Sequence, residues 1–415
     1  MPRRFNQTSH FMKYPLDGIT VIDLSHALAG PFCTTMLADY GAQVIKVEPP
    51  TGDIARGWGA QIAGGETAYF VSLHRNKRGV VLDLKTAEGK EVFFKLLEKA
   101  DVVIENYRVG ALKRMGLDYE AARKRNPGII YCSISGFGQD GPYRDRAALD
   151  LILQAESGLI SVTGEPGTSG TRAGVSIADL TAGMNAAYAI MLALRVKEKT
   201  GVGQQIDVSM LEGQMALLGT LIANYYADGV VPKPQGTAYA VVVPYQTFHT
   251  KTQDIAVAVA GEKIWQVFCP TIGAPELRDD PRYKTTIDRM NNRATLIPRL
   301  QEIFLTRSYQ EWETLLLANE IPCGAINNIE QLMQHPQVQA RGSMHEVHHR
   351  TAGTVHVVGS PVRLSATPAR VPAPSPTLGE HTRDVMREVL GLPETEIDKL
   401  AASGVFGKPA KGKSS

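Results

Sequence analysis

Short apolar runs alternate with amphipathic stretches through the first half of the chain. The runs of strand length are residues 18–24, 43–48, 80–84, 101–105 and 128–134. Nearly continuous apolar runs are typical of parallel strands that are buried on both faces. Between them, helical spacing of apolar residues covers 31–40, 88–99 and 111–124. Strands that alternate with helices predict an α/β fold, with an open parallel sheet covered on both sides.

The longest apolar helix of the pattern is predicted at 176–197. Its Ala, Leu and Met residues lie on nearly every face, and a helix that is apolar all round is expected to be buried. Asp179 lies in the first turn, where backbone N–H groups and the helix dipole favour a carboxylate. Two interpretations stay open at this point. Asp179 caps the helix, or it is an ionised carboxylate held ready to attack an electrophile.

The pattern changes after the Gly- and Pro-rich stretch 228–235. A further strand is predicted at 255–260, followed by helices at 263–272, 293–305 and 309–319. Residues 353–364 alternate like a strand pair, and 383–390 have helical spacing. We therefore expect a large domain at 1–228, a small α/β domain at 229–326, and a linker and C-terminal segment at 327–415.

Composition and charge exclude several classes of protein. The chain is 43% hydrophobic, and its 44 basic and 42 acidic residues give a net charge of +2. This balance requires neither nucleic acid nor a membrane surface as a partner. The four cysteines form no CxxC pair, which suits a reducing compartment. With no apolar run of membrane-spanning length and no secretory signal, we expect a soluble, cytoplasmic protein.

Two familiar motifs do not fit their usual function here. A dinucleotide site would place three glycines after the first strand, but residues 24–31 contain only Gly30. The segment His345–His349 matches H-E-x-x-H, yet Gly342 before it and Gly353 after it argue against the helix that a zinc protease needs. We interpret it as a polar loop or strand edge and predict no metal site.

Basic residues are concentrated next to two of the predicted strands. One group is at 74–78, and the other comprises Arg108 and Arg114. A solvated turn is the alternative explanation for the first group. Guanidinium groups, however, suit phosphates. Two basic loops at strand ends of one sheet fit a ligand that carries several phosphates.

Six short motifs occur along the chain in a fixed order, and their order makes a chance match improbable. They are Asp23-Leu-Ser-His-Ala-Leu-Ala-Gly-Pro31, Gly52-Asp-Ile-Ala-Arg-Gly-Trp58, Leu73-His-Arg-Asn-Lys-Arg78, Glu105-Asn-Tyr-Arg108, Ile177-Ala-Asp179 and Leu378-Gly-Glu-His-Thr382. Together they resemble the family III CoA-transferases of the CaiB/BaiF type, over about residues 18–392. The resemblance implies a Rossmann-like large domain to which the chain's end returns. It also implies an interlocked homodimer, in which each chain threads the ring made by the other.

The resemblance further implies an activity and its residues. The enzyme would move CoA from an acyl-CoA, such as succinyl-CoA, to a free carboxylic acid, with no permanently bound cofactor. Asp179 matches the catalytic aspartate, which forms an acyl anhydride and then an aspartyl-CoA thioester. Trp58 matches a position near the active site. The matching coenzyme A contacts are Leu28, Ala29, Leu73, His74, Arg75, Asn76, Asn106, Tyr107, Arg108, Arg114, Arg146 and Asp150.

Two alternative functions are kept. The α-methylacyl-CoA racemases share the fold, but a racemase needs two bases on opposite sides of the α-carbon. They carry a histidine where this chain has Leu149, so Asp179 would lack its partner. The other alternative is a non-catalytic CoA-binding protein.

Among acceptors, oxalate is disfavoured, because Leu28 replaces a glutamine and Gly261 stands where formyl-CoA:oxalate enzymes have a run of glycines.

Overall fold

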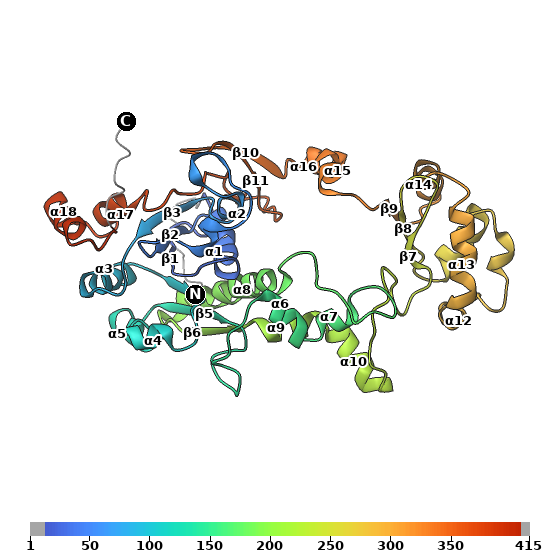
Figure 1. The fold of residues 1–415 in the computed structure, drawn as a ribbon, viewed down its shortest axis with the longest axis horizontal. Coiled ribbons are helices and arrows are strands. Elements are labelled where there is room, and N and C mark those ends of the chain that lie inside the picture. The colour runs from blue at the N-terminus through green and yellow to red at the C-terminus, as the bar shows by residue number, and fades with distance from the viewer. Residues whose placement is uncertain (1–12, 408–415) are drawn as a thin grey trace, which may run out of the picture. The chain divides into compact units, whose positions relative to one another are not determined.

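The computed structural model describes residues 13–407, which form two compact units. The first unit contains residues 13–157, 174–220 and 341–407, and the second contains 158–173 and 221–340. The chain leaves the first unit twice and returns to it for its last part (Figure 1). The second unit starts before, and ends after, the small domain expected at 229–326. The stretch 228–235 therefore marks irregular backbone inside this unit rather than its border.

A six-stranded parallel sheet forms the centre of the first unit. Its order is β3-β2-β1-β4-β5-β6, which is that of a doubly wound, Rossmann-like sheet. The strands are β1 (Thr20–Asp23), β2 (Gln43–Glu48), β3 (Lys77–Val81), β4 (Val102–Glu105), β5 (Ile130–Ser135) and β6 (Gln205–Ser209). The predicted α/β class is confirmed. The third strand was expected at 80–84 but starts at Lys77, a buried lysine that is paired with Asp23.

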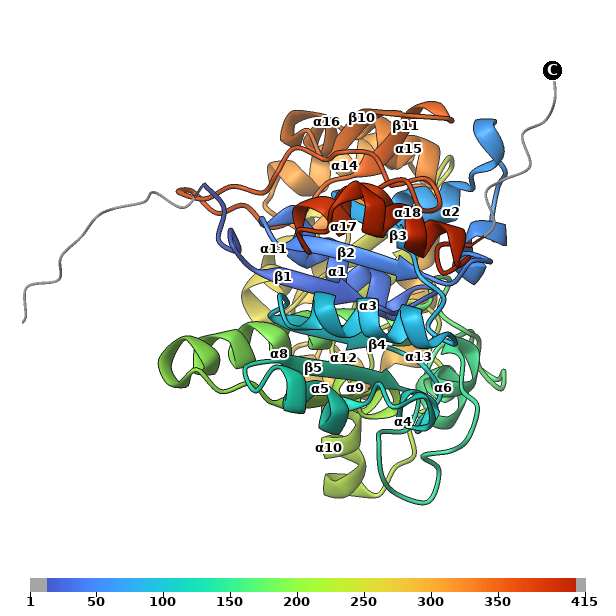
Figure 2. The ribbon, with the colours of Figure 1, turned by 90° about the vertical axis from the view of Figure 1, so that its left-hand side faces the viewer.

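Successive residues along the strands face two different hydrophobic layers. Val21 and Val44 pack against α1 (Ala29–Asp39) and α8 (Ile177–Thr200). Ile22 and Ile45 face the opposite layer, where α3 and α5 cover the sheet (Figure 2). The other helices of this unit are α2 (Ala68–Leu73), α3 (Ala87–Leu97), α4 (Ala111–Met115), α5 (Tyr119–Arg125), α6 (Asp150–Glu156), α9 (Met210–Leu217), α17 (Thr382–Glu388) and α18 (Glu394–Ala402), with 3-10 turns η1 (Ile54–Gly57) and η2 (Ala63–Gly65).

The C-terminal segment packs on the edge strand β3. The Gly79 N–H donates to His381 Nδ1 at 3.1 Å, and the Val81 N–H donates to Thr382 Oγ1 at 3.1 Å. Val385 and Met386 of α17 then join the buried layer beside β2 and β3. These contacts close β3, which would otherwise leave an unpaired sheet edge.

The H-E-x-x-H motif lies on a strand. β10 (Met344–His349) and β11 (Gly353–Val358) form an antiparallel hairpin in the first unit. His349 is buried, and its Nδ1 accepts a hydrogen bond from the Ala352 N–H at 3.1 Å, so it stabilises the hairpin turn. Among residues 13–407, no group of three His, Cys, Asp or Glu side chains could hold a metal ion.

The second unit is built on a three-stranded antiparallel sheet, β7 (Tyr245–Phe248), β8 (Ile255–Ala258) and β9 (Cys323–Ala325). Its core is rich in aromatic side chains, among them Trp265, Phe304 and Trp312. Its helices, including those at its borders, are α7 (Leu159–Val162), α10 (Gly219–Asp228), α11 (Glu262–Thr271), η3 (Pro275–Arg278), α12 (Thr286–Asn291), α13 (Arg293–Phe304), α14 (Tyr309–Ala318), α15 (Ile329–Gln334) and α16 (Pro336–Arg341).

One side of α8 is buried and the other is not. Ala182, Ala186 and Ile190 are fully buried in the first unit, whereas Tyr188 and Leu192 are 68% and 52% exposed. The expectation of a helix buried on all sides is therefore wrong for the single chain. By length and composition α8 could also cross a membrane, but half of its apolar stretch is buried within the protein, as in many core helices.

Candidate active site

The first turn of α8 is capped by a residue from another helix. Ser176 makes no side-chain cap. Instead, Asp150 Oδ1 accepts a hydrogen bond from the Ala178 N–H at 2.9 Å, and Asp150 Oδ2 accepts one from Gln154 Nε2 at 2.8 Å. Asp150, a predicted CoA contact, therefore supports the start of α8. The capping role that Asp179 could have had belongs to Asp150.

Asp179 is poorly hydrated and lies within the field of a second carboxylate. Burial, and after it the charge of Asp150, raises the pKa of Asp179 to about 7. The helix dipole acts in the opposite direction, but its usual effect of about 0.3–1 kcal/mol is worth less than one pKa unit. Burial therefore dominates, and the pKa of Asp179 stays far above that of an ordinary aspartate.

Tyr69 lies near Asp179, and Trp58 packs against Tyr69. Tyr69 on α2 has its pKa raised to about 12 by burial and then by the charge of Asp179. The rings of Tyr69 and Trp58 meet edge to face, with centroids 5.6 Å apart. Tyr69 thus connects Trp58 to the neighbourhood of Asp179. Sequence reasoning missed Tyr69 because it missed α2, although Thr67, which caps that helix by accepting from the Phe70 N–H, was an available signal.

The start of α1 lies against α8 one turn after Asp179. Gly183 permits this approach: a Cβ atom added there would come within 2.6 Å of the Ala29 carbonyl oxygen. Leu28 and Ala29, two predicted CoA contacts, are both nearly buried at this crossing. The crossing therefore brings the two residues to the region of the predicted nucleophile.

Asn106 joins the loop after β4 to the loop after β1. The His26 N–H donates to Asn106 Oδ1 at 2.9 Å, and Asn106 Nδ2 donates to the His26 carbonyl at 2.8 Å. The rings of Tyr107 and His26 also pack edge to face. Burial lowers the pKa of His26. These two polar loops therefore meet at the carboxyl ends of the neighbouring strands β1 and β4, the edge at which ligands of such sheets bind.

The side chains of the segment Leu73–Asn76 mostly contact other residues of the protein. Arg75 forms a buried two-bonded ion pair with Asp39, at 3.0 and 2.6 Å. His74 stacks on Phe70, with centroids 3.9 Å apart. Burial, followed by the charge of Lys77, holds the pKa of His74 well below its usual range, so its ring is neutral. Phosphate contacts from Arg75 would require its pair with Asp39 to open.

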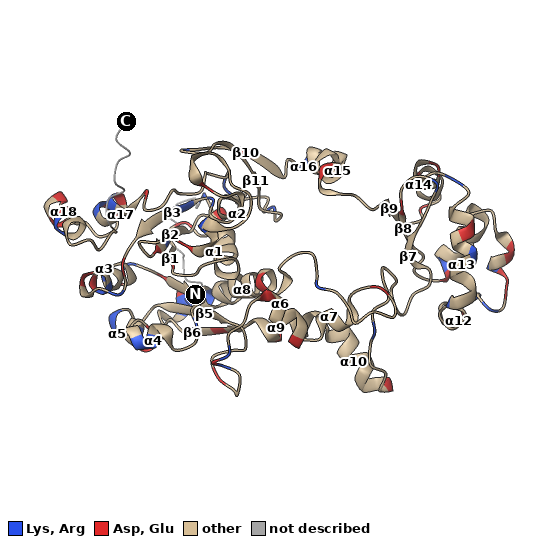
Figure 3. Cartoon of the chain, in the orientation of Figure 1, with Lys and Arg blue, Asp and Glu red and all other residues tan. Residues whose placement is uncertain are grey.

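The exposed arginines lie in other segments: Arg108 and Arg146 are in loops, and Arg114 is in α4. Arg108 and Arg114 are exposed, and neither forms an ion pair with another described residue. Figure 3 shows further cations in α4 and α5, of which Arg123 and Arg125 pair with nearby glutamates. Arg146 is also exposed, pairs with Glu156 and stacks over the Tyr143 ring at 4.5 Å. Of the predicted cations, Arg108 and Arg114 are therefore the most available to an anionic ligand.

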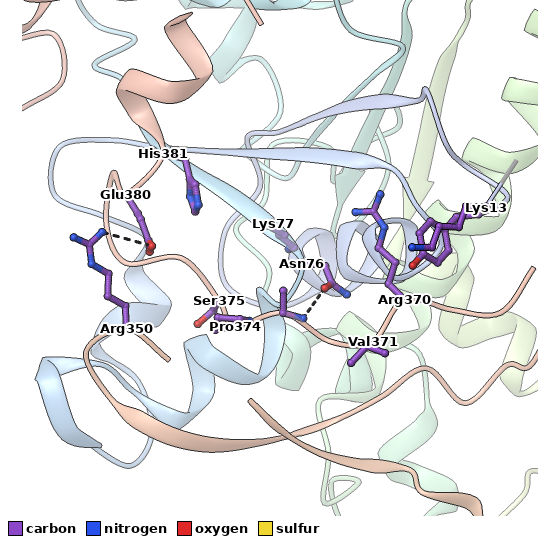
Figure 4. A pocket seen from close by; sticks show the side chains of 12 residues that line it. Lys13, Asn76, Lys77, Arg350, Arg370, Val371, Pro374, Ser375, Glu380 and His381 are labelled. Carbon is purple, nitrogen blue, oxygen red and sulfur yellow. Dashed lines mark hydrogen bonds and ion pairs between the residues drawn. The ribbon is translucent and has the colours of Figure 1, made fainter. Parts of the chain in front are cut away.

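A cavity of about 610 Å³ opens elsewhere, at the amino end of β3 (Figure 4). Asn76 is the one predicted CoA contact in its wall, and its Oδ1 already accepts from the Ala373 N–H at 2.7 Å. The cations Arg350 and Arg370 are paired with Glu380 and Asp17. This cavity does not contain Asp179.

A Rossmann-like sheet with a poorly hydrated carboxylate at a helix start, and exposed arginines in the same unit, indicates an α/β enzyme that acts on an anionic substrate. The sequence matches "CoA-transferase family III" over residues 16–382, and the chain belongs to this family. It is 40% identical to "Succinyl-CoA:glutarate CoA-transferase" of Homo sapiens over 392 residues, covering 94% of this chain and 90% of that protein. "Succinate--glutarate CoA-transferase" of Agrobacterium fabrum is also 40% identical, over 92% of this chain and 98% of that protein.

Solved structures agree with this assignment. A CaiB/BaiF family protein from Brucella suis superposes with a TM-score of 0.80 at 35% identity, covering 91% of this chain and 99% of that chain. Rv3272 from M. tuberculosis gives 0.80 at 30% identity, covering 89% and 98%. The predicted family is confirmed. The chain is an enzyme that transfers CoA between acyl-CoA thioesters and carboxylates, rather than a non-catalytic CoA-binding protein.

Proposed function

We propose that Asp179 is the nucleophile of a covalent CoA transfer. One Asp179 carboxylate oxygen attacks the thioester carbonyl of the donor, the C–S bond breaks, and an acyl–aspartyl anhydride and a CoA thiolate form. The thiolate then attacks the aspartyl carbonyl, which releases the donor acid and leaves an aspartyl–CoA thioester. The acceptor carboxylate attacks this thioester, which expels the CoA thiolate and forms a second anhydride, now between the acceptor and Asp179. The thiolate then attacks the acceptor carbonyl of this anhydride, which gives the new acyl-CoA and releases the Asp179 carboxylate.

The observation that carries this proposal is the setting of Asp179. Its poor hydration raises its pKa to about 7, and a weakly solvated carboxylate gives up little hydration when it attacks. Asp150 takes over the capping of α8, which leaves the Asp179 side chain for the substrate. Tyr69 lies near enough for the charge of Asp179 to raise its pKa.

We assign coenzyme A to the loops around this carboxylate. Leu28 and Ala29 would line the pantetheine arm near Asp179. Asn106 and Tyr107 follow in the adjoining loop, and Arg108 and Arg114 would bind phosphates, for which exposed guanidinium groups are well suited. Leu73, His74, Arg75 and Asn76 stay proposed contacts by their match to the family, and a contact from Arg75 would require its pair with Asp39 to open. Arg146 and Asp150 are proposed contacts in and before α6.

The substrates follow from the relatives. Two proteins that are 40% identical to this chain are named for succinyl-CoA or succinate and glutarate. We therefore propose succinyl-CoA as the donor and a short dicarboxylic acid, such as glutarate, as the acceptor. We further propose that the enzyme acts in the cytoplasm without a resident cofactor. The balanced charge of the chain requires neither nucleic acid nor a membrane surface as a partner.

We also propose that two chains form the interlocked homodimer. Its support is the exposed apolar face of α8, on which Met184, Tyr188, Met191, Leu192 and Val196 recur every three or four residues. Such a face is unusual on a monomer and typical of an interface between proteins.

Trapping of the covalent intermediate tests the nucleophile. The protein is incubated with succinyl-CoA, treated with borohydride or hydroxylamine, and digested for mass spectrometry. Borohydride should reduce the aspartyl thioester, and hydroxylamine should convert it to a hydroxamate, on the peptide with Asp179. The Asp179→Asn variant should show no modification and no transfer to glutarate. Turnover by wild type with no adduct, or full activity of Asp179→Asn, would contradict the proposal.

The racemase alternative has its own readout. Leu149, where a racemase would carry its histidine, is 73% exposed and cannot accept a proton. The wild-type protein should therefore incorporate no solvent deuterium at the α-carbon of a 2-methylacyl-CoA. Incorporation without any acceptor acid would favour the racemase.

A further inference from the structure

The loop between β1 and α1 is held in a conformation that its own residues disfavour. Ala27 has φ 65°, which lies in the left-handed region that residues with a Cβ atom rarely adopt. Ala27 directly precedes Leu28 and Ala29, the proposed CoA contacts at the start of α1. A backbone in this state persists only when the surrounding structure supports it.

Two buried charged residues supply the support. Asp53 Oδ1 accepts a hydrogen bond from the Ala27 N–H at 3.2 Å, and Asp53 Oδ2 pairs with Lys46 Nζ at 2.8 Å. The same Lys46 Nζ donates to the Ser25 carbonyl. The Lys46 and Asp53 side chains are only 1% and 0% exposed. This Lys46–Asp53 clamp therefore fixes the backbone on both sides of His26.

Stability alone accounts poorly for the clamp. A buried ion pair must repay the desolvation of both charges, and apolar residues of similar size often do as well. Here, however, both charges make directed bonds to one short loop. Asp53 is itself oriented by its N–H bond to Glu48 Oε2 at 2.9 Å and by the Ala55 N–H bond to Asp53 Oδ1 at 2.9 Å.

We propose that Lys46 and Asp53 are positioning residues for acyl-CoA, which hold residues 25–29 in the shape that binds the coenzyme without touching it. This inference rests on the proposed function, which assigns Leu28 and Ala29 to coenzyme A. It predicts that loss of the clamp weakens coenzyme binding by the folded protein, in addition to the stability that is lost when one partner of a buried ion pair is removed.

Calorimetric titration with free CoA tests the proposal on the full chain. Lys46→Met should raise the Kd for CoA about tenfold, as expected when a supporting contact behind a binding group is lost. Asp53→Asn, a milder change that keeps an acceptor for the Ala27 N–H, should raise it less. The control is Lys197→Met, which removes a partly buried lysine from its ion pair with Asp101 at 2.7 Å, away from this loop. The control should leave the Kd within about twofold.

A rescue variant separates positioning from general stability. Glycine adopts φ near 65° without strain, so Ala27→Gly in the Lys46→Met background should recover part of the CoA affinity. General loss of stability would not be repaired this way. Wild-type CoA affinity in Lys46→Met and Asp53→Asn, or no rescue by Ala27→Gly, would overturn the inference. Failure of wild type to transfer CoA, while it still binds CoA, would instead overturn the proposed function alone.

Discussion

At the scale of single residues, the chemistry depends on how two carboxylates share the start of α8. Asp150 accepts the Ala178 N–H bond and so stays where a negative charge suits the helix. Asp179, one residue further on, lacks that bond and is poorly hydrated. Burial and the nearby Asp150 charge both oppose its ionisation. The result is an acid whose protonation changes within the range of physiological pH.

This arrangement predicts the pH profile of the enzyme. Because Asp179 must be ionised to attack, kcat/KM for the acyl-CoA should fall as the pH drops below about 7. Asp150→Asn removes the repelling charge but keeps an oxygen for the Ala178 N–H. The acid limb should therefore move to lower pH. Steady-state rates from pH 5 to 9 measure it, with Asp140→Asn, an exposed acid, as the control. An unmoved limb in Asp150→Asn would contradict the assigned cause.

The same raised pKa predicts an effect on stability. A carboxylate with a higher pKa in the folded state than in the unfolded state costs stability where it is ionised, above about pH 7, and costs nothing below about pH 4. Asp179→Asn should therefore raise the free energy of unfolding by about 2 kcal/mol at pH 8, reduced from the full linkage value because the side chain is partly exposed. Urea unfolding at pH 8 and pH 4 measures the difference. Equal stability at pH 8 would contradict a desolvated Asp179.

At the scale of elements, the crossing of α1 and α8 sets the distance between Leu28 and Ala29 and the turn that carries Asp179. Gly183→Ala would place a Cβ atom 2.6 Å from the Ala29 carbonyl, so it should cost about 1–3 kcal/mol of unfolding free energy and raise KM for acyl-CoA. In the control Gly219→Ala, the new Cβ meets nothing within 4 Å. It should leave stability unchanged or raise it slightly. Urea unfolding measures the stability of both variants, and steady-state kinetics measure their KM. If Gly183→Ala changes neither quantity, α1 and α8 tolerate a small separation.

The strands of the sheet were predictable because their burial leaves a plain pattern. β2 has the predicted bounds, and β1, β4 and β5 lie within two residues of theirs. β3 was misplaced because Lys77, though charged, is buried through its pair with Asp23. The hairpin of β10 and β11 was also placed too late, since polar residues alternate on its exposed face.

The candidate site was less predictable because side chains take partners from distant segments. In the sequence, Arg75 resembles a phosphate ligand. In the structure it is paired with Asp39, which lies 36 residues earlier in the chain. Asp150 resembles a CoA contact and caps α8. Lys46 stands within the apolar run of β2, and nothing in the sequence indicates that its side chain bonds to Ser25 and Asp53. Such pairings depend on the order of strands in the sheet, which apolar periodicity does not encode.

At the scale of the whole molecule, the exposed face of α8 is the feature that a single chain leaves unexplained. Its buried face is lined by small residues that pack on α1, whereas its outer face carries Tyr188 at 68% and Leu192 at 52% exposure. Covering such residues with a second chain would gain about 25 cal/mol for each Å² of apolar surface buried. A carboxylate introduced there would have to be buried without a partner.

This cost predicts the outcome of a disruption experiment. Tyr188→Glu and Leu192→Glu should convert the proposed dimer to monomers, measured by light scattering on a size-exclusion column, while circular dichroism retains the helical signal. The control Leu317→Glu changes an exposed leucine of α14 (54% exposed) and should leave the mass unchanged. If the α8 variants keep the mass of a dimer, another surface joins the chains. A wild-type monomer would show that the outer face of α8 meets solvent, and transferase activity of that monomer would show that the active site is complete within one chain.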